Sequence, residues 1–159
     1  MIKVLFVCLG NICRSPMAEA IFRDMVKKNN LADRIKVDSA GTGNWHVGNP
    51  PHEGTRKILD REKISYEGMA ARQVSENDWD DFDYIIAMDD DNMANLDKLR
   101  TADVTTAKLM DFIENAPEDN VPDPYFTGDF DYTYKLVTAG CENLLDYILE
   151  KNDLVKENL

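Results

Sequence analysis

The chain has 159 residues, enough for one domain that buries its own hydrophobic core. It carries 18 lysines and arginines against 30 aspartates and glutamates, and this net charge of −12 disfavours nucleic acid and anionic membrane surfaces as partners, because both bind clustered cations. No stretch approaches the roughly 20 apolar residues of a membrane span, and the amino-terminal residues lack the pattern of a signal peptide. Three cysteines are an odd number, which favours free thiols in a reducing compartment, the cytoplasm, over a disulfide framework.

Strand-like and helix-like segments alternate along the chain, as in a doubly wound α/β fold. Residues 4–7 and 84–88 are continuous apolar runs, typical of central parallel strands covered on both faces, whereas residues 35–37 and 107–109 alternate in polarity as edge strands do. Apolar positions at helical spacing predict helices over 17–26 and 130–148. No linker divides the chain, so we expect a single domain, residues 1–159, with a central four-stranded parallel sheet flanked by helices.

The segment between the first predicted strand and the first predicted helix reads Cys8-Leu9-Gly10-Asn11-Ile12-Cys13-Arg14-Ser15-Pro16. A tight loop that leads into a helix N-terminus binds anions, because its backbone N–H groups and the helix dipole direct positive charge at one centre. Gly10 and Asn11 tolerate a positive φ in such a loop, Ser15 is a favoured N-cap, and Pro16 suits the first helical position. The segment therefore predicts a phosphate-binding loop.

Two side chains of this loop carry reactive chemistry. Cys8 lies at its base, where the same positive field favours the thiolate, a nucleophile, and the planar fork of Arg14 can hold two phosphate oxygens. A thiolate that attacks a phosphate ester also needs a general acid for the leaving group. We expect this acid to be Asp123, which two flanking prolines hold in place. The chain's 2 histidines, His46 and His52, lie in a loop-like stretch without a motif, and we expect both to be solvated.

Residues 7–20 resemble the signature of the low-molecular-weight protein tyrosine phosphatases almost residue for residue. Further matches are residues 38–42, Met88-Asp89 with Asn92, and Asp123-Pro124-Tyr125, so the resemblance spans the chain. It implies a cysteinyl-phosphate mechanism, in which Cys8 attacks phosphorus, Arg14 holds the phosphate oxygens, and Asp123 protonates the leaving phenolate and then activates water. No cofactor is expected. The aspartate-rich stretches at 78–83 and 89–91 match no calcium-loop spacing, so they predict a solvated face or a helix N-terminus and no metal site.

The resemblance also implies supporting roles. The hydroxyl of Ser15 would bond to the Cys8 thiolate, although Ser15 also fits a plain N-cap. Asn11 and Ser39 would belong to a network that holds the loop backbone, and Asp89 would position Arg14 or the loop. This network must differ from that of many relatives, which carry a His-x-Ala-Arg stretch where residues 68–72 here have no histidine.

The resemblance further implies a substrate slot with Trp45 and Tyr125 as aromatic walls and with Leu9 and Ile12 lining its mouth, a shape that suits a phenyl phosphate. Cys141 occupies the apolar face of the last predicted helix and is expected in the core. Cys13 has two open interpretations: a small buried filler, or the partner of Cys8 in a reversible disulfide that protects the nucleophile.

Other functions are compatible with parts of this pattern. Related arginine phosphatases carry threonine at the position of Ile12, and arsenate reductases of similar fold need a further cysteine pair that is missing between Arg14 and Cys141. A sugar-uptake phosphocarrier would not need Arg14 or Asp123, and a phosphotyrosine-binding module would have lost the nucleophile or the acid. We therefore expect an enzyme that hydrolyses phosphotyrosine and whose partners are phosphotyrosine-containing proteins, with an arginine phosphatase or an arsenate reductase as the alternatives.

Overall fold

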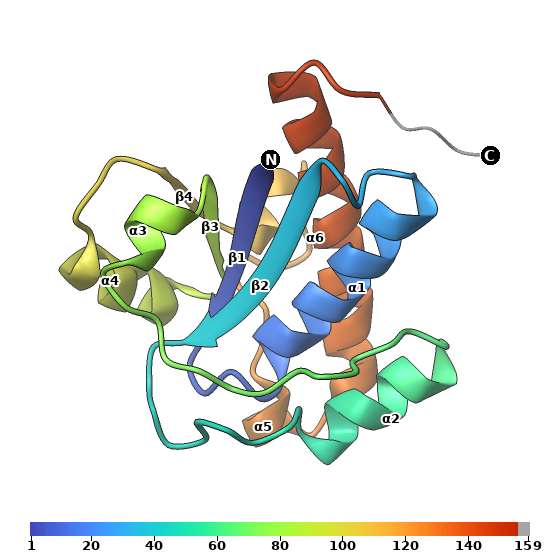
Figure 1. Ribbon diagram of the computed structural model, residues 1–159. Coiled ribbons are helices and arrows are strands. Elements are labelled where there is room, and N and C mark those ends of the chain that lie inside the picture. The colour runs from blue at the N-terminus through green and yellow to red at the C-terminus, as the bar shows by residue number, and fades with distance from the viewer. Residues whose placement is uncertain (156–159) are drawn as a thin grey trace.

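The computed structural model describes residues 1–155. Within them, a four-stranded parallel sheet in the order β2-β1-β3-β4 forms the centre of the molecule (Figure 1). The strands are β1 (Ile2–Cys8), β2 (Ile35–Gly41), β3 (Tyr84–Ala87) and β4 (Thr105–Lys108). β1 and β3 are central and β2 and β4 are the edges, so the expected α/β fold with a four-stranded parallel sheet is confirmed.

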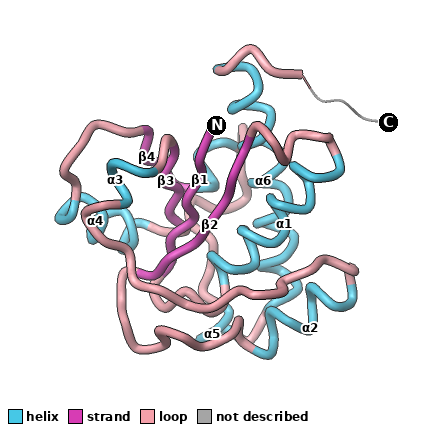
Figure 2. Tube along the Cα trace, in the orientation of Figure 1, coloured by secondary structure: helices cyan, strands magenta, loops and turns pink. Residues whose placement is uncertain are grey.

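Helices cover both faces of the sheet (Figures 1 and 2). One face carries α1 (Arg14–Lys28) and the long α6 (Phe130–Lys151), with α2 (Glu53–Arg61) beside them. The other face carries α3 (Asp78–Asp81) and α4 (Asp90–Leu99). The short helices η1 (Leu109–Phe112) and α5 (Pro124–Thr127) lie between β4 and α6. Over residues 1–155 no helix is long and apolar enough to cross a membrane.

The apolar run of β1 is explained by burial on both faces. Val4 and Phe6 belong to the larger hydrophobic cluster, which includes the inner faces of α1 and α6. Leu5 and Val7 alternate with them and belong to the second cluster, with Trp79 of α3. All four residues of the run are fully buried, so a central parallel strand has no solvated face that would require polar residues.

Element boundaries differ from the sequence-based expectations mainly at the edge strands. β2 continues past residue 37 to Gly41, because its pairing with β1 runs on to the pair Cys8 and Gly41. β4 begins at Thr105, earlier than the predicted 107–109. Polar residues in these strands hide the pattern, since an edge strand is only partly covered. Both predicted helices are present, and α1 and α6 extend beyond their predicted ranges.

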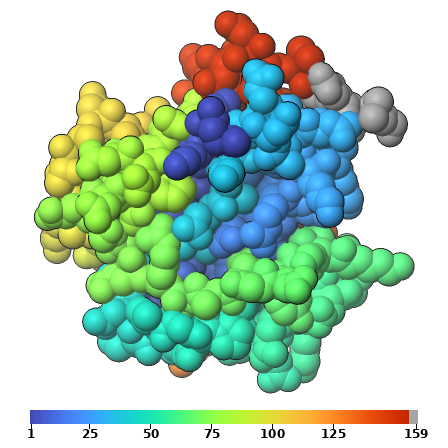
Figure 3. Space-filling view, viewed as in Figure 1, coloured from blue at the N-terminus to red at the C-terminus, as the bar shows by residue number. Residues whose placement is uncertain are grey.

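The carboxyl ends of the parallel strands meet at one edge of the sheet, the usual position of a ligand site in this architecture. The loop from Cys8 to α1 lies at this edge, which is the lower one in Figure 1. Residues 42–75, coloured from cyan to green in Figure 3, form much of the lower part of the molecule below that edge. The segment after β2 thus lies beside the predicted phosphate-binding loop.

Candidate active site

Residues 9–13 connect β1 to α1 and form a tight loop. Asn11 has a φ of 56°, in the left-handed region that asparagine tolerates better than most residues. Gly10 was expected to share this conformation, but it is not among the glycines with positive φ; a Cβ there would lie 3.0 Å from Cδ2 of His46. At Gly41, a Cβ would lie 2.9 Å from the carbonyl oxygen of Leu9. Small residues at both positions therefore allow the loop to pack closely.

The helix start differs from the prediction. α1 begins at Arg14, and the N-cap residue is Cys13, which makes no capping bond through its side chain. The expectations of Ser15 as N-cap and Pro16 as first helical residue are therefore wrong. The hydroxyl of Ser15 instead lies 3.0 Å from Sγ of Cys8, so the folded loop uses this side chain at the thiol rather than at the helix end.

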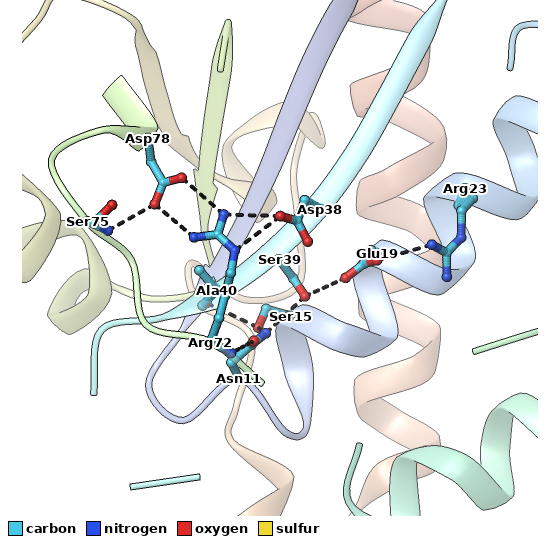
Figure 4. A network of polar contacts seen from close by, with 10 residues as sticks. All are labelled: Asn11, Ser15, Glu19, Arg23, Asp38, Ser39, Ala40, Arg72, Ser75 and Asp78. Atoms are coloured by element: carbon cyan, nitrogen blue, oxygen red, sulfur yellow. Dashed lines mark hydrogen bonds and ion pairs between the residues drawn. The ribbon is translucent and has the colours of Figure 1, made fainter. Parts of the chain in front are cut away.

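A buried polar network supports the loop (Figure 4). Nδ2 of Asn11 donates to Oγ of Ser15 at 2.8 Å and to Oγ of Ser39 at 2.9 Å, so these three residues lie together. Oδ1 of Asn11 accepts the backbone N–H of Arg72 at 3.0 Å, and the Arg72 guanidinium pairs with Asp78. Asp78 is only 4% exposed, whereas Asp80, Asp81 and Asp83 are exposed. The acidic stretch at 78–83 begins the helix α3, so the expected helix N-terminus is confirmed.

The guanidinium of Arg14 is 2% exposed and lies among acidic groups. Nη1 donates to Asp89 at 2.6 Å and to the carbonyl of Val121 at 3.0 Å, and Nη2 donates to Asp123 at 3.3 Å. Burial alone would lower the pKa of Arg14, but the negative groups of Cys8, Asp89 and Asp123 outweigh it and raise that pKa above its ordinary value. Arg14 therefore stays a cation, held in place by carboxylates from two distant segments.

One donor of Arg14 has no partner. Nε is fully buried and makes no hydrogen bond to any group in the part of the chain that the structure describes. Buried donors are rarely left unpaired. Nε and Nη2 lie on one edge of the guanidinium plane, the edge that binds two oxygens of a carboxylate or phosphate.

Asp123 lies at the N-cap of α5. Its Oδ1 accepts the backbone N–H of Tyr125 at 3.0 Å, while Oδ2 accepts from Arg14. The side chain is 20% exposed. The two flanking prolines and the cap bond therefore hold a carboxylate beside Arg14 that still reaches solvent.

A cavity of about 230 Å³ opens above the loop. Cys8 lies in its wall with Asp123, and the apolar part of the wall comes from Leu9, Ile12, Trp45, Tyr125 and Phe126. Trp45 and Tyr125 are 68% and 53% exposed, unusual for large aromatic side chains. The structure thus brings every predicted wall residue to one cavity.

The two histidines, which were expected to be solvated, are half-buried. His46 lines the same cavity. Nδ1 of His52 accepts the N–H of Gly54 at 3.0 Å and caps α2, while its ring stacks on Phe130 at 5.2 Å and contacts Tyr125 edge-on at 5.9 Å. The adjacency of His46 to a predicted wall residue, Trp45, is the sequence signal that could have placed it.

All three cysteines lie within the described residues, are free and are buried. Burial, followed by the negative groups of Cys8 and Asp123, raises the pKa of Cys13 from its ordinary 9.0 to about 12. Burial also raises the pKa of Cys141, which lies fully buried in the core as predicted. Cys13 is thus a protonated neighbour of the loop, and whether it pairs with Cys8 on oxidation stays a prediction.

Comparison with known proteins identifies the class. A model of the low molecular weight phosphotyrosine protein phosphatases matches residues 3–157. The chain is 57% identical over 156 residues to the low molecular weight protein-tyrosine-phosphatase YfkJ of Bacillus subtilis, covering 97% of this chain and all (100%) of that protein. It is 48% identical to the Staphylococcus aureus protein-tyrosine-phosphatase PtpA, over 97% of this chain and 98% of that one.

Solved structures agree. The crystal structure of YfkJ superposes with a TM-score of 0.93 at 57% identity, covering 95% of this chain and 96% of that chain. A Drosophila arginine phosphatase superposes with a TM-score of 0.86 at 35% identity, covering 92% and 98%. The chain therefore belongs to the low-molecular-weight protein tyrosine phosphatase family and is a phosphoric monoester hydrolase.

Proposed function

We propose that this phosphatase works through a cysteinyl-phosphate intermediate on Cys8. The observation that carries the proposal is that Cys8 and Asp123 line one aromatic cavity, while the buried Arg14 donates to Asp123 at 3.3 Å. Sγ of Cys8 attacks phosphorus and forms the S–P bond as the O–P bond to the leaving group breaks. Ser15, 3.0 Å away, is the hydrogen-bond donor that stabilises the thiolate.

Arg14 binds the transferring phosphoryl group. Its unpaired Nε and the adjacent Nη2 form a planar fork that fits two phosphate oxygens. Asp89 and Val121 hold the opposite side of the guanidinium through Nη1. This anchoring supports a preorganised fork, which stabilises charge in the transition state without a cost of reorganisation.

Asp123 serves as general acid and then as general base. In the first step it gives its proton to the departing phenolate oxygen. In the second step it takes a proton from the water that attacks phosphorus, so that a new O–P bond forms, the S–P bond breaks, and phosphate and the Cys8 thiolate are released. Its hydrogen bond from Tyr125 and its contact with Arg14 support a fixed position at the phosphate site.

The cavity favours phosphotyrosine as substrate. Trp45 and Tyr125 present exposed aromatic faces, and Ile12 adds a branched apolar surface, so a phenyl ring has apolar contacts on several sides. Phosphoarginine is the second candidate, because an arginine phosphatase is among the similar structures. Ile12 supports phosphotyrosine, because we expect arginine phosphatases to carry threonine at this position.

Substitution of Cys8 tests the mechanism. For Cys8→Ser we expect turnover of a phosphotyrosine peptide, measured with a chelator present, to fall below about a thousandth of the wild-type kcat. Phosphate binding, measured by calorimetry, should be largely kept. Rapid acid quench with a ³²P-labelled substrate should trap labelled wild-type enzyme and no labelled variant.

Cys141→Ala is the matched control, because it removes another buried thiol that lies in the core. It should keep wild-type turnover and the trapped intermediate. A kcat of Cys8→Ser above about a thousandth of the wild-type value would point to another nucleophile.

We also propose a cytoplasmic location and phosphotyrosine proteins as partners. Three unpaired thiols support a reducing compartment. The family implies phosphoprotein substrates, and the net charge of −12 argues against nucleic acid.

A further inference from the structure

A buried carboxylate lies behind the phosphate-binding loop and has no assigned role. Glu19, on the first half of α1, is 6% exposed. Its Oε1 accepts the hydroxyl of Ser39 at 2.6 Å, and its Oε2 accepts from Arg23 at 3.3 Å (Figure 4). A carboxylate removed from water costs free energy unless it is well paired, and burial raises the pKa of Glu19 above its ordinary value. The cost of burying this carboxylate points to a specific role for Glu19.

The direction of each hydrogen bond behind the loop can be assigned. The backbone N–H of Arg72 can only donate, so it fixes Oδ1 of Asn11 at that side, 3.0 Å away. Nδ2 of Asn11 must then face the two hydroxyls, and its two protons match the two oxygens of Ser15 and Ser39. Both hydroxyls therefore accept from Asn11.

Each hydroxyl has a single proton left to donate. The proton of Ser39 goes to Glu19, whose oxygen is 2.6 Å away. The proton of Ser15 has two possible acceptors: Sγ of Cys8 at 3.0 Å and the carbonyl of Ala40 at 3.5 Å. The shorter contact and the negative charge of a thiolate favour Cys8.

We propose that Glu19 is a positioning residue for Cys8: it accepts the hydrogen bond that the hydroxyl of Ser39 donates, and through Asn11 it directs the hydroxyl of Ser15 to donate to the thiolate. This inference rests on the proposed role of Cys8 as nucleophile. The chain of contacts links α1, β2 and the loop, and all its side chains from Glu19 to Cys8 are buried. Without an acceptor at position 19, the Ser39 proton can turn toward Asn11, where donor faces donor and the network loosens.

Arg23 keeps Glu19 an acceptor. A guanidinium only donates, so its contact with Oε2 favours the ionised carboxylate. This placement also separates two physical effects on Cys8. A negative charge nearby disfavours a thiolate by repulsion, whereas the hydrogen-bond chain favours it. If repulsion dominates, removing Glu19 makes the Cys8 thiolate easier to form. If the hydrogen-bond chain dominates, removing Glu19 makes the thiolate harder to form.

Two substitutions of similar shape test the proposal. Glu19→Met keeps the length of the side chain and removes the acceptor, whereas Glu19→Gln removes the charge and keeps an acceptor. We expect Glu19→Met to lower kcat by about tenfold, with KM within about twofold, from the loss of one charge-assisted hydrogen bond. The pH at which the rate of Cys8 alkylation by iodoacetamide is half of its maximum should rise. Glu19→Gln should restore both readouts to within about threefold of wild type.

Asp24→Asn is the matched control, since it removes a carboxylate of the same helix that pairs with Lys28 on the surface. It should change neither readout, and thermal melts should show all variants folded. A wild-type alkylation profile in Glu19→Met, a shift to lower pH, or equal losses in the Met and Gln variants would each overturn the proposal. Failure of the proposed function would instead appear as an active Cys8→Ser variant, whatever Glu19 does.

Discussion

At the residue scale, the geometry of Arg14 is more demanding than its charge. Its three nitrogens have distinct surroundings: Nη1 is held by Asp89 and Val121, Nη2 contacts Asp123, and Nε has no partner among residues 1–155. A lysine ammonium supplies one point charge and cannot span these positions. Asp89 and Val121 therefore fix the Arg14 guanidinium through Nη1 and leave the edge with Nε and Nη2 facing the other way.

We predict that Arg14→Lys lowers kcat by about a hundredfold or more and weakens phosphate binding, because a point charge cannot replace two parallel hydrogen bonds. Steady-state kinetics and calorimetry with phosphate measure both effects. Arg61→Lys, on an exposed side chain that pairs with Glu62, is the control and should be silent. Near-normal kinetics in Arg14→Lys would show that the site needs only positive charge.

Ile12 tests substrate choice at the same scale. The residue is 8% exposed and lines the cavity beside the nucleophile. Ile12→Thr replaces a methyl surface that packs on a phenyl ring by a hydroxyl that can bond a guanidinium. We predict a shift of about 10- to 200-fold in kcat/KM for phosphoarginine relative to phosphotyrosine peptides. Ile12→Val should leave the ratio near wild type, and an unchanged ratio in Ile12→Thr would assign the choice to Trp45 and Tyr125.

At the element scale, α6 packs closely on η1 at Gly140. A Cβ added there would lie 2.5 Å from Cγ of Leu109, which is itself fully buried. Glycine inside a helix normally costs about 1 kcal/mol relative to alanine, so the sequence alone marks this position as a place to stabilise the protein. The close approach of the two elements reverses that expectation.

We predict that Gly140→Ala lowers the free energy of unfolding by up to about 2 kcal/mol, because an overpacking cost of up to about 3 kcal/mol exceeds the gain of about 1 kcal/mol in helix propensity. Urea denaturation followed by circular dichroism measures the change. Lys135→Ala, on the exposed side of α6, should shift stability by less than about 0.5 kcal/mol. A more stable Gly140→Ala would mean that η1 yields without cost.

At the scale of the whole molecule, buried thiols connect stability to pH. Burial raises the pKa of Cys13 from its ordinary 9.0 to about 12, and it also raises the pKa of Cys141 above its ordinary value. A raised pKa means that the unfolded state loses these protons first as pH rises. The stability from the neutral thiols is therefore complete below about pH 9 and is lost as pH increases through the raised values.

We predict that the free energy of unfolding falls above pH 9, with each buried thiol contributing a slope of up to about 1.4 kcal/mol per pH unit. Denaturant titrations from pH 8 to 11 measure the slope. Cys141→Ala should have a smaller slope, because one titrating group is gone. The variant's free energy of unfolding should be lower than that of the wild type below pH 9. An identical slope in this variant would show that other groups govern the alkaline loss.

Much of the fold follows from local pattern. The apolar run of β1 and the helical spacing of α1 and α6 were sufficient to predict an α/β fold, because burial on one or both faces leaves a periodic trace in neighbouring residues. Boundaries of β2 and β4 were not predictable in this way, since their ends depend on the pairing partner. The start of α1 at Arg14 was also predicted incorrectly, because Ser15 bonds to Cys8 and does not cap the helix.

Cys8 and Arg14 could be predicted from the sequence because both lie in the short segment between a strand and a helix, where local geometry alone places a thiol and a cation beside a helix N-terminus. Their supports were decided only by the tertiary structure. Asp89 and Asp123 reach Arg14 across separations of 75 and 109 residues, and Glu19 acts through Ser39, a residue of another element. Such contacts depend on which strands become neighbours in the sheet, and no local pattern of charge or hydrophobicity encodes the direction of a hydrogen bond between them.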